Sequence, residues 1–118
     1  MFAKIKIGEQ AVPMLATAAC NIYYKTVFGV DPIRLTSQAS RGELADEDAA
    51  NFAMQMGFIF AKAAEAPGDR SKMLTLNFDA YVEWIDQFET ADMFNAAGMI
   101  MQLYNGDRPD SKEKKEEN

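Results

Sequence analysis

The sequence predicts an α+β protein that is mainly α, in which an N-terminal β-hairpin packs on a bundle of about four helices. Apolar and polar residues alternate from Lys4 to Ile7, which is the period of a half-buried strand. Apolar residues then recur at helical spacing over most of the chain up to Tyr104. The 118 residues are 48% hydrophobic, which is enough for one ordered core. We therefore expect a single domain over residues 1–106.

The hairpin is predicted from two short apolar runs separated by a turn. Gly8-Glu9-Gln10 lies between the alternating run and a second run, Ala11 to Leu15, and a glycine-containing turn in this position is typical of a hairpin. Pro13 has no N–H, so the second strand should be an edge strand or end early. Because two strands alone are marginal in water, their apolar residues must pack on helices. These residues are Ile5, Ile7, Val12 and Leu15.

A first helix is predicted from about Ala18 to Phe28, with Thr17 as its N-cap and Gly29 just after its end. Helical spacing places one set of side chains on its buried face, with Tyr24 and Phe28 beside them. This set is Ala19, Ile22, Tyr23 and Val27. Asp31-Pro32 is typical of an N-cap followed by a first helical proline. It should start one short turn through Leu35, followed by a polar connection over 36–42.

The longest helix is predicted from about Asp46 to Glu65, since three acidic residues at its start favour the positive end of the helix dipole. One broad apolar arc should face the core. It consists of Ala49, Phe52, Ala53, Met56, Ile59, Phe60 and Ala63. Met54 and Phe58 lie outside that arc, next to the polar side of the helix.

Two further helical segments complete the predicted bundle. Asn77 can cap a segment over 78–89 with Trp84 at the edge of its apolar face. That face consists of Phe78, Tyr81, Val82, Ile85 and Phe88. Thr90 can cap a last helix, Ala91 to Tyr104, whose apolar residues cover more than half of its circumference. Such a helix is either central in the core or shared with a partner.

Charge and composition exclude several classes of protein. The net charge is −6, which argues against nucleic acid as a partner. No apolar run approaches a membrane span or a secretory signal, and a single cysteine fits a reducing compartment. We therefore expect a cytoplasmic protein. Residues 107–118 contain no hydrophobic side chain, which predicts a disordered charged tail.

No residue pattern indicates catalysis. The chain has no histidine, which removes the commonest general base and all histidine metal sites. The acidic run over 43–48 lacks the spacing of a calcium loop. Cys20 lacks a basic partner and is better explained as a small buried apolar residue than as a nucleophile. We expect no catalytic, cofactor-binding or metal-binding residues, and therefore no enzyme.

Partner binding is the remaining source of function in the pattern. Met54 and Phe58, spaced i, i+4 beside the polar stripe, predict a second contact surface. The alternative is that the hairpin or the last helix covers them, and Trp84 presents the same choice between binding and packing. The candidate partner-binding residues are Met54, Phe58, Trp84, Met99 and Leu103.

The order of these parts resembles a known family. The opening "KIKIGEQAVPML", the following "ATAACNIYYKTVFGVDPIRL", an Ala/Met/Phe-rich helix, "YVEWIDQFE", a last helix and a Lys-rich end resemble the tail assembly chaperones of long-tailed bacteriophages and prophages. The resemblance covers essentially the whole chain. It implies a small protein of the host cytoplasm that binds the tape measure protein and keeps it soluble while tail tube protein polymerises around it. Members are typically absent from the mature virion.

The resemblance implies further properties. It admits the major tail protein and a second copy of the chain as additional partners, with no cofactor. The family commonly makes a longer form by programmed ribosomal frameshifting, and Lys114-Lys115 lies where slippery codons would be. An alternative function is that of a small helical adaptor or regulator, such as a transcription-factor partner or an antitoxin-like protein. No basic recognition helix supports its DNA-binding version.

Overall fold

A computed structural model of the chain describes residues 1–109 and confirms the predicted class. Within this range the chain forms a two-stranded antiparallel sheet and helices of 5 to 20 residues. In order, the elements are β1 Phe2–Ile7, β2 Gln10–Leu15, α1 Ala19–Phe28, α2 Pro32–Ser40, α3 Asp46–Glu65, α4 Arg70–Leu74, α5 Phe78–Ile85 and α6 Thr90–Tyr104. The tail expected over 107–118 and the Lys114-Lys115 pair fall largely or wholly in residues 110–118, outside the described part.

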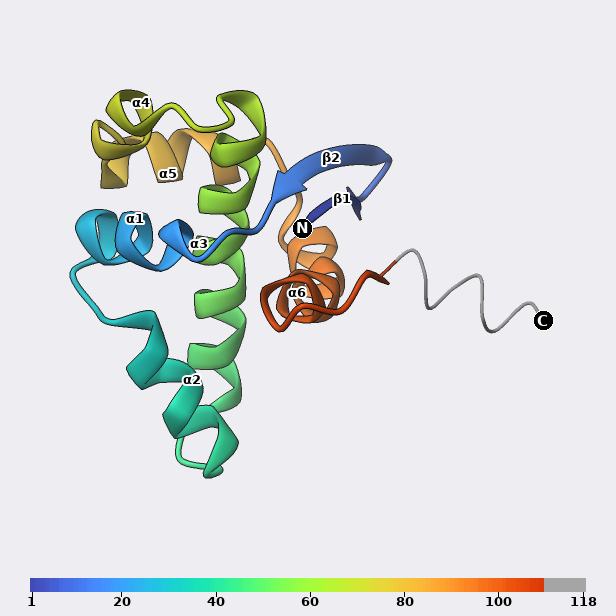
Figure 1. Ribbon diagram of the computed structural model, residues 1–118. Coiled ribbons are helices and arrows are strands. Elements are labelled where there is room, and N and C mark those ends of the chain that lie inside the picture. The colour runs from blue at the N-terminus through green and yellow to red at the C-terminus, as the bar shows by residue number, and fades with distance from the viewer. Residues whose placement is uncertain (110–118) are drawn as a thin grey trace.

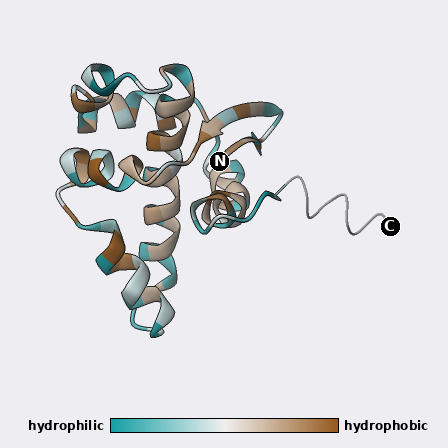
Figure 2. Ribbon diagram, in the orientation of Figure 1, coloured by the Kyte–Doolittle hydropathy of each residue, from teal (hydrophilic) through white to brown (hydrophobic). Residues whose placement is uncertain are grey.

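Helix α3 is the centre of the fold, and its bounds are those that the sequence predicts. The predicted core arc is buried apart from the half-buried Ala49, and Met54 and Phe58 are buried as well. Six consecutive residues, Met56 to Ala61, are buried. Because consecutive helical residues point in different directions, this stretch must be covered on every side. The hairpin, α6, α1 and α5 all contact it (Figure 1). Figure 2 shows the corresponding change from teal at the helix ends to brown tones in its middle.

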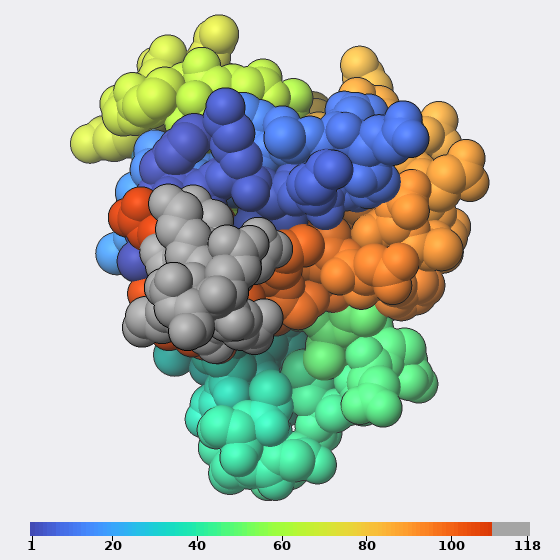
Figure 3. Space-filling model, turned by 90° about the vertical axis from the view of Figure 1, so that its right-hand side faces the viewer, coloured from blue at the N-terminus to red at the C-terminus, as the bar shows by residue number. Residues whose placement is uncertain are grey.

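The hairpin lies over α3 and across α6, as Figure 3 shows from the side. Its inner face carries Ala3, Ile5 and Ile7 from β1 and Met14 from β2, all buried. The predicted burial of Ile5 and Ile7 is confirmed, whereas Val12 and Leu15 are only half-buried. This packing on helices supplies the apolar contact that an isolated hairpin lacks.

Pro13 is accommodated by the register of the hairpin. Met1 and Ala16 exchange both backbone bonds, with N···O distances of 2.6 and 2.8 Å. Bonded and non-bonded pairs alternate in an antiparallel ladder, so Pro13, which lies opposite Lys4, falls in a non-bonded pair. Its missing N–H would point to the free edge. The edge position is therefore confirmed, while the early end is wrong, because β2 continues to Leu15.

The turn of the hairpin depends on glycine at position 8. Gly8 has φ +64°, and a Cβ built on it would lie 2.6 Å from a carboxylate oxygen of Asp92 in α6. A side chain at this position would have to adopt a backbone conformation that favours glycine, and the Asp92 side chain would have to move to make room for it. The turn consists of Gly8 and Glu9 alone, because Ile7 pairs with Gln10, so Gln10 belongs to the strand.

Helix α1 crosses α3 and is tied to it by a hydrogen bond. The hydroxyl of Tyr24 donates to Oε1 of Gln55 at 2.6 Å, and burial raises the pKa of this hydroxyl. Gly29 ends the helix in the left-handed region, as predicted, with its N–H donating to Lys25 O. The predicted N-cap, Thr17, is wrong: Ala18 holds that position without a side-chain bond.

The connection after α1 is more helical than expected. The Asp31 carboxylate accepts the N–H of Ile33 at 3.0 Å, which confirms the predicted cap. However, α2 continues to Ser40, so the polar connection predicted from residue 36 is wrong. The hydroxyls of Thr36 and Ser40 donate to carbonyls of the preceding turn, which gives these polar residues partners within the helix. Helix α4 was not predicted.

Helix α5 differs from expectation in its length and its buried face, and α6 differs in its N-cap. Helix α5 ends at Ile85, whereas the predicted segment runs over 78–89. The Asn77 side chain caps α5 through the N–H of Ala80 at 2.9 Å, as predicted. The buried residues of α5 are Tyr81 and Trp84, whereas Phe78 and Val82 are exposed, so the predicted buried face is wrong in part. Helix α6 starts at Thr90 itself, and its N-cap residue is Glu89. Its buried residues are Met93, Ala96, Ile100 and Leu103.

Two helical glycines give opposite predictions for stability. A Cβ at Gly57 would lie 2.8 Å from Cδ1 of Ile100, whereas a Cβ at Gly98 would meet no described neighbour within 4 Å. We expect Gly57→Leu to lower the free energy of unfolding by about 1–3 kcal/mol through overpacking. Gly98→Ala, the control, should raise it by up to about 1 kcal/mol through helix propensity. Denaturant unfolding measures both, and a Gly57→Leu variant as stable as the wild type would contradict the close approach of α3 and α6.

Candidate interaction surface

The structure places the five sequence-predicted partner residues inside the fold. Met54, Phe58, Trp84 and Leu103 are buried, and Met99 is half-buried. The ring of Phe58 lies 5.6 Å from that of Tyr81, 5.8 Å from that of Trp84 and 6.5 Å from that of Phe28, measured between ring centroids. The structure therefore favours the packing alternative for these residues. The cover over Phe58 includes α1 and α5, which the sequence did not suggest.

The exposed apolar side chains lie elsewhere. Nine large hydrophobic residues are at least 40% exposed. They are Met1, Phe2, Ile22, Val30, Ile33, Leu74, Phe78, Val82 and Phe94. Single exposed apolar residues are normal on a protein surface, so only those that lie together are candidates for binding. Two groups satisfy this condition.

The first group is the α1–α2 groove, a hollow of about 380 Å³. It is lined by Asn21, Ile22, Lys25, Thr26, Asp31 and Ile33. Ile22 and Ile33 are 63% and 62% exposed, the highest values among the large hydrophobic residues described. The side chain of Asp31 holds the start of α2 in place by capping Ile33, so this cap orients one wall of the groove. The groove has one cation and one anion, Lys25 and Asp31, at its rim.

The second group is the α5 face, which we define as Phe78, Asp79, Val82, Glu83 and Asp86. All five residues are exposed. The inner edge of the Phe78 ring packs on the rings of Phe28 and Tyr81, with centroid distances of 6.3 and 5.8 Å, and this contact holds the exposed part of the ring in position. Phe78 and Val82 are four residues apart, which places them on one side of a helix.

Sequence reasoning missed both groups because each helix has two plausible apolar faces. In α1 the residues Cys20, Tyr23, Tyr24 and Val27 follow i, i+3, i+4, i+7 spacing and are buried or half-buried, as are Ala19 and Phe28. Of the predicted face, Ala19, Tyr23 and Val27 are therefore covered, and Ile22 is exposed. In α5, Tyr81, Trp84 and Phe88 have i, i+3, i+7 spacing, and this pattern in the sequence could have indicated the face that is buried.

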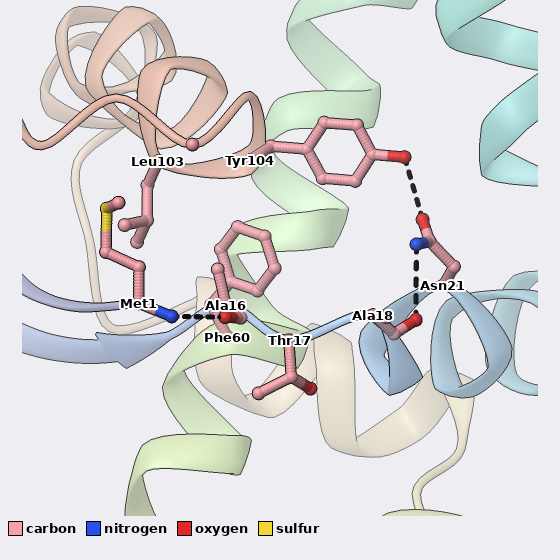
Figure 4. Close-up of a pocket in the computed structure, with 9 residues that line it drawn as sticks. Met1, Ala16, Thr17, Ala18, Asn21, Phe60, Leu103 and Tyr104 are labelled. Atoms are coloured by element: carbon pink, nitrogen blue, oxygen red, sulfur yellow. Dashed lines mark hydrogen bonds between the residues drawn. The ribbon is translucent and has the colours of Figure 1, made fainter.

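A third hollow, of about 370 Å³, lies where the hairpin, α1 and α6 meet (Figure 4). Its lining includes the apolar side chains of Met1, Phe60 and Leu103. Its polar groups bond to one another: the Tyr104 hydroxyl donates to Oδ1 of Asn21 at 2.7 Å, and Nδ2 of Asn21 donates to Ala18 O at 3.2 Å. Burial raises the pKa of the Tyr104 hydroxyl. The side chains of Tyr104 and Asn21 are therefore already hydrogen-bonded within the hollow.

Cys20 is the single cysteine of the chain. Cys20 is buried, as predicted, with its thiol 3.6 Å from Leu15 O and 3.5 Å from Oγ1 of Thr17. No group of three or more His, Cys, Asp or Glu side chains in residues 1–109 is arranged to hold a metal ion. Within the same range, no helix is both long enough and apolar enough to cross a membrane.

Comparisons with protein-family models, with curated proteins and with solved structures found no match to this chain. The candidate surface is therefore defined by the geometry of the chain itself.

The floor of the α5 face predicts a pH dependence of stability. Burial raises the pKa of Tyr81 from 10.0 to about 12. Below pH 10 the hydroxyl is protonated in both the folded and the unfolded chain. From pH 10 to 12 the unfolded chain releases this proton while the folded chain retains it, so stability falls as the pH rises. We expect the melting temperature of Tyr81→Phe to fall less between pH 10 and pH 12 than that of the wild type. Equal falls in the two proteins would show that the pKa of Tyr81 is not raised in the folded chain.

Proposed function

We propose that this chain is a non-enzymatic chaperone of phage tail assembly. In this proposal it binds the tape measure protein and keeps it soluble while tail tube protein polymerises around it. The observation that carries the proposal is the pair of apolar surfaces, the α1–α2 groove and the α5 face, on a domain whose core is otherwise closed. The resemblance of the opening sequence and of the order of elements to tail assembly chaperones supports the same function.

The physical requirements of such a chaperone agree with these surfaces. A long helical client exposes apolar side chains that would otherwise aggregate, so its chaperone needs apolar contacts that are accessible without unfolding. Ile22, Ile33, Phe78 and Val82 meet this requirement, since each is between 47% and 63% exposed. The net charge of −6 helps to keep the chaperone and its complex in solution.

The proposal includes a location and further partners. The chain would act in the host cytoplasm and be absent from the mature virion. The major tail protein and a second copy of the chain are additional partners in this proposal.

Co-expression tests the proposed function. We expect the wild-type chain to raise the soluble fraction of the tape measure protein encoded beside it, and the two to purify together. A variant with serine at positions 22, 33, 78 and 82 should keep the helical circular dichroism spectrum, because all four side chains are about half exposed or more, but should lose most of the solubilising effect. Its melting temperature is measured as well, because Phe78 also contacts Phe28 and Tyr81. An unchanged soluble fraction with the wild-type chain would overturn the proposed function. Undiminished activity of the serine variant would show that the contact lies on another surface.

A further inference from the structure

The negative charge of this protein is concentrated in one segment. Of the 18 acidic and 12 basic residues in the sequence, six acidic and no basic ones lie within residues 73–107, so the rest of the chain is balanced at twelve of each. The segment contains α5 and α6. Four of the exposed large hydrophobic residues also belong to it: Leu74, Phe78, Val82 and Phe94. Net acidity and exposed apolar area therefore occur on the same part of the molecule.

On the α5 face these two properties form parallel rows. Phe78 and Val82 make an apolar row along the helix. Asp79, Glu83 and Asp86 lie beside it at spacings of four and three residues, so their carboxylates recur about every helical turn, or roughly 5 Å. All three are exposed. Among residues 1–109, the ion pairs are Arg41 with Glu43 and Lys62 with Glu65, so no side-chain cation neutralises this acidic row.

We infer that the α5 face binds an amphipathic helix of the partner that carries lysine or arginine beside its apolar row. The inference rests on the proposed function and specifies which segments of the client are recognised. A partner helix has the same turn-by-turn spacing, so its apolar row can pack on Phe78 and Val82 while its cations face the acidic row. Because exposed ion pairs add little energy each, the apolar contact supplies most of the affinity, and the charges select and orient the helix.

A second copy of the chain fits this face less well. Two α5 faces packed antiparallel would bring their acidic rows to the same side, which is unfavourable, and two packed in parallel would leave each acidic row without a cation opposite it. The hairpin of a second copy has exposed lysines, Lys4 and Lys6, but they project from a strand. These lysines are about 7 Å apart along the strand, whereas the carboxylates of the α5 face recur about every 5 Å. The lysines of the strand therefore do not match the acidic row as the cations of a helix do.

A peptide titration tests the inference directly. The probe is a labelled amphipathic helix of about 20 residues made of Leu and Lys, and the matched probe replaces every Lys by Glu. We expect only the Leu/Lys peptide to bind, with an anisotropy change that weakens as salt increases. The triple variant Asp79→Asn, Glu83→Gln, Asp86→Asn should raise its dissociation constant about tenfold. The double variant Phe78→Ser, Val82→Ser should weaken binding by at least as much.

A matched control separates a site from general attraction. The variant Asp46→Asn, Glu47→Gln, Asp48→Asn removes three exposed acidic residues from the start of α3 and leaves the same net charge as the α5 triple variant. It should bind the Leu/Lys peptide like the wild type. Equal weakening by both triple variants, or equal binding of the Leu/Glu peptide, would overturn the inference. Self-association of the chain that the α5 triple variant abolishes would assign the face to a second copy and would also overturn it.

The inference and the proposed function fail in different ways. Suppose that the wild-type chain does not solubilise the tape measure protein but the Leu/Lys peptide still binds through α5. The proposed function is then wrong, whereas the preference of the α5 face for basic amphipathic helices still holds. If the α5 triple variant solubilises the tape measure protein as well as the wild type does, the chaperone function remains and the recognition of basic helices through α5 is wrong. Circular dichroism spectra and melting temperatures of every variant exclude misfolding as the cause of either result.

Discussion

The burial of α3 between Met56 and Ala61 is the constraint on which the rest of the structure depends. A helix with six consecutive buried residues has no side that can face water, so other elements must cover all of it. The hairpin, α6, α1 and α5 provide this cover. Gly57 allows Ile100 of α6 to approach the helix closely. The hairpin is too small to be stable alone, and its packing on α3 and α6 holds it in place.

Covering α3 leaves apolar side chains on the outside of its neighbours. Helices α1 and α5 have ten and eight residues, and each has apolar residues on more than one side. Once Tyr24 and Cys20 face α3, Ile22 must point away from it, since it lies on the opposite side of α1. Burying Tyr81 and Trp84 likewise leaves Phe78 and Val82 exposed. The candidate binding surfaces therefore consist of the apolar side chains of α1 and α5 that remain exposed once the other faces of these helices pack on α3.

Charge gives these two surfaces different selectivity. The α1–α2 groove has one cation and one anion, Lys25 and Asp31, at its rim, so it has little preference for the charge of a partner. The α5 face has three carboxylates and no basic residue within the surrounding segment. A client with several amphipathic helices could therefore contact both surfaces, with only one of them discriminating between basic and acidic helices.

The sequence by itself determined the fold class, the hairpin, the bounds of α3 and the caps at Asp31 and Asn77, because these follow from local rules: strand alternation, helix length and capping chemistry. Only the tertiary structure decided which face of α1 and of α5 is buried. In both helices the predicted and the observed apolar faces overlap, and the final orientation depends on the shape of α3 and its other neighbours. For this reason Phe58 and Trp84, predicted as binding residues, are in the core, while Ile22 and Val82, predicted as core, are exposed.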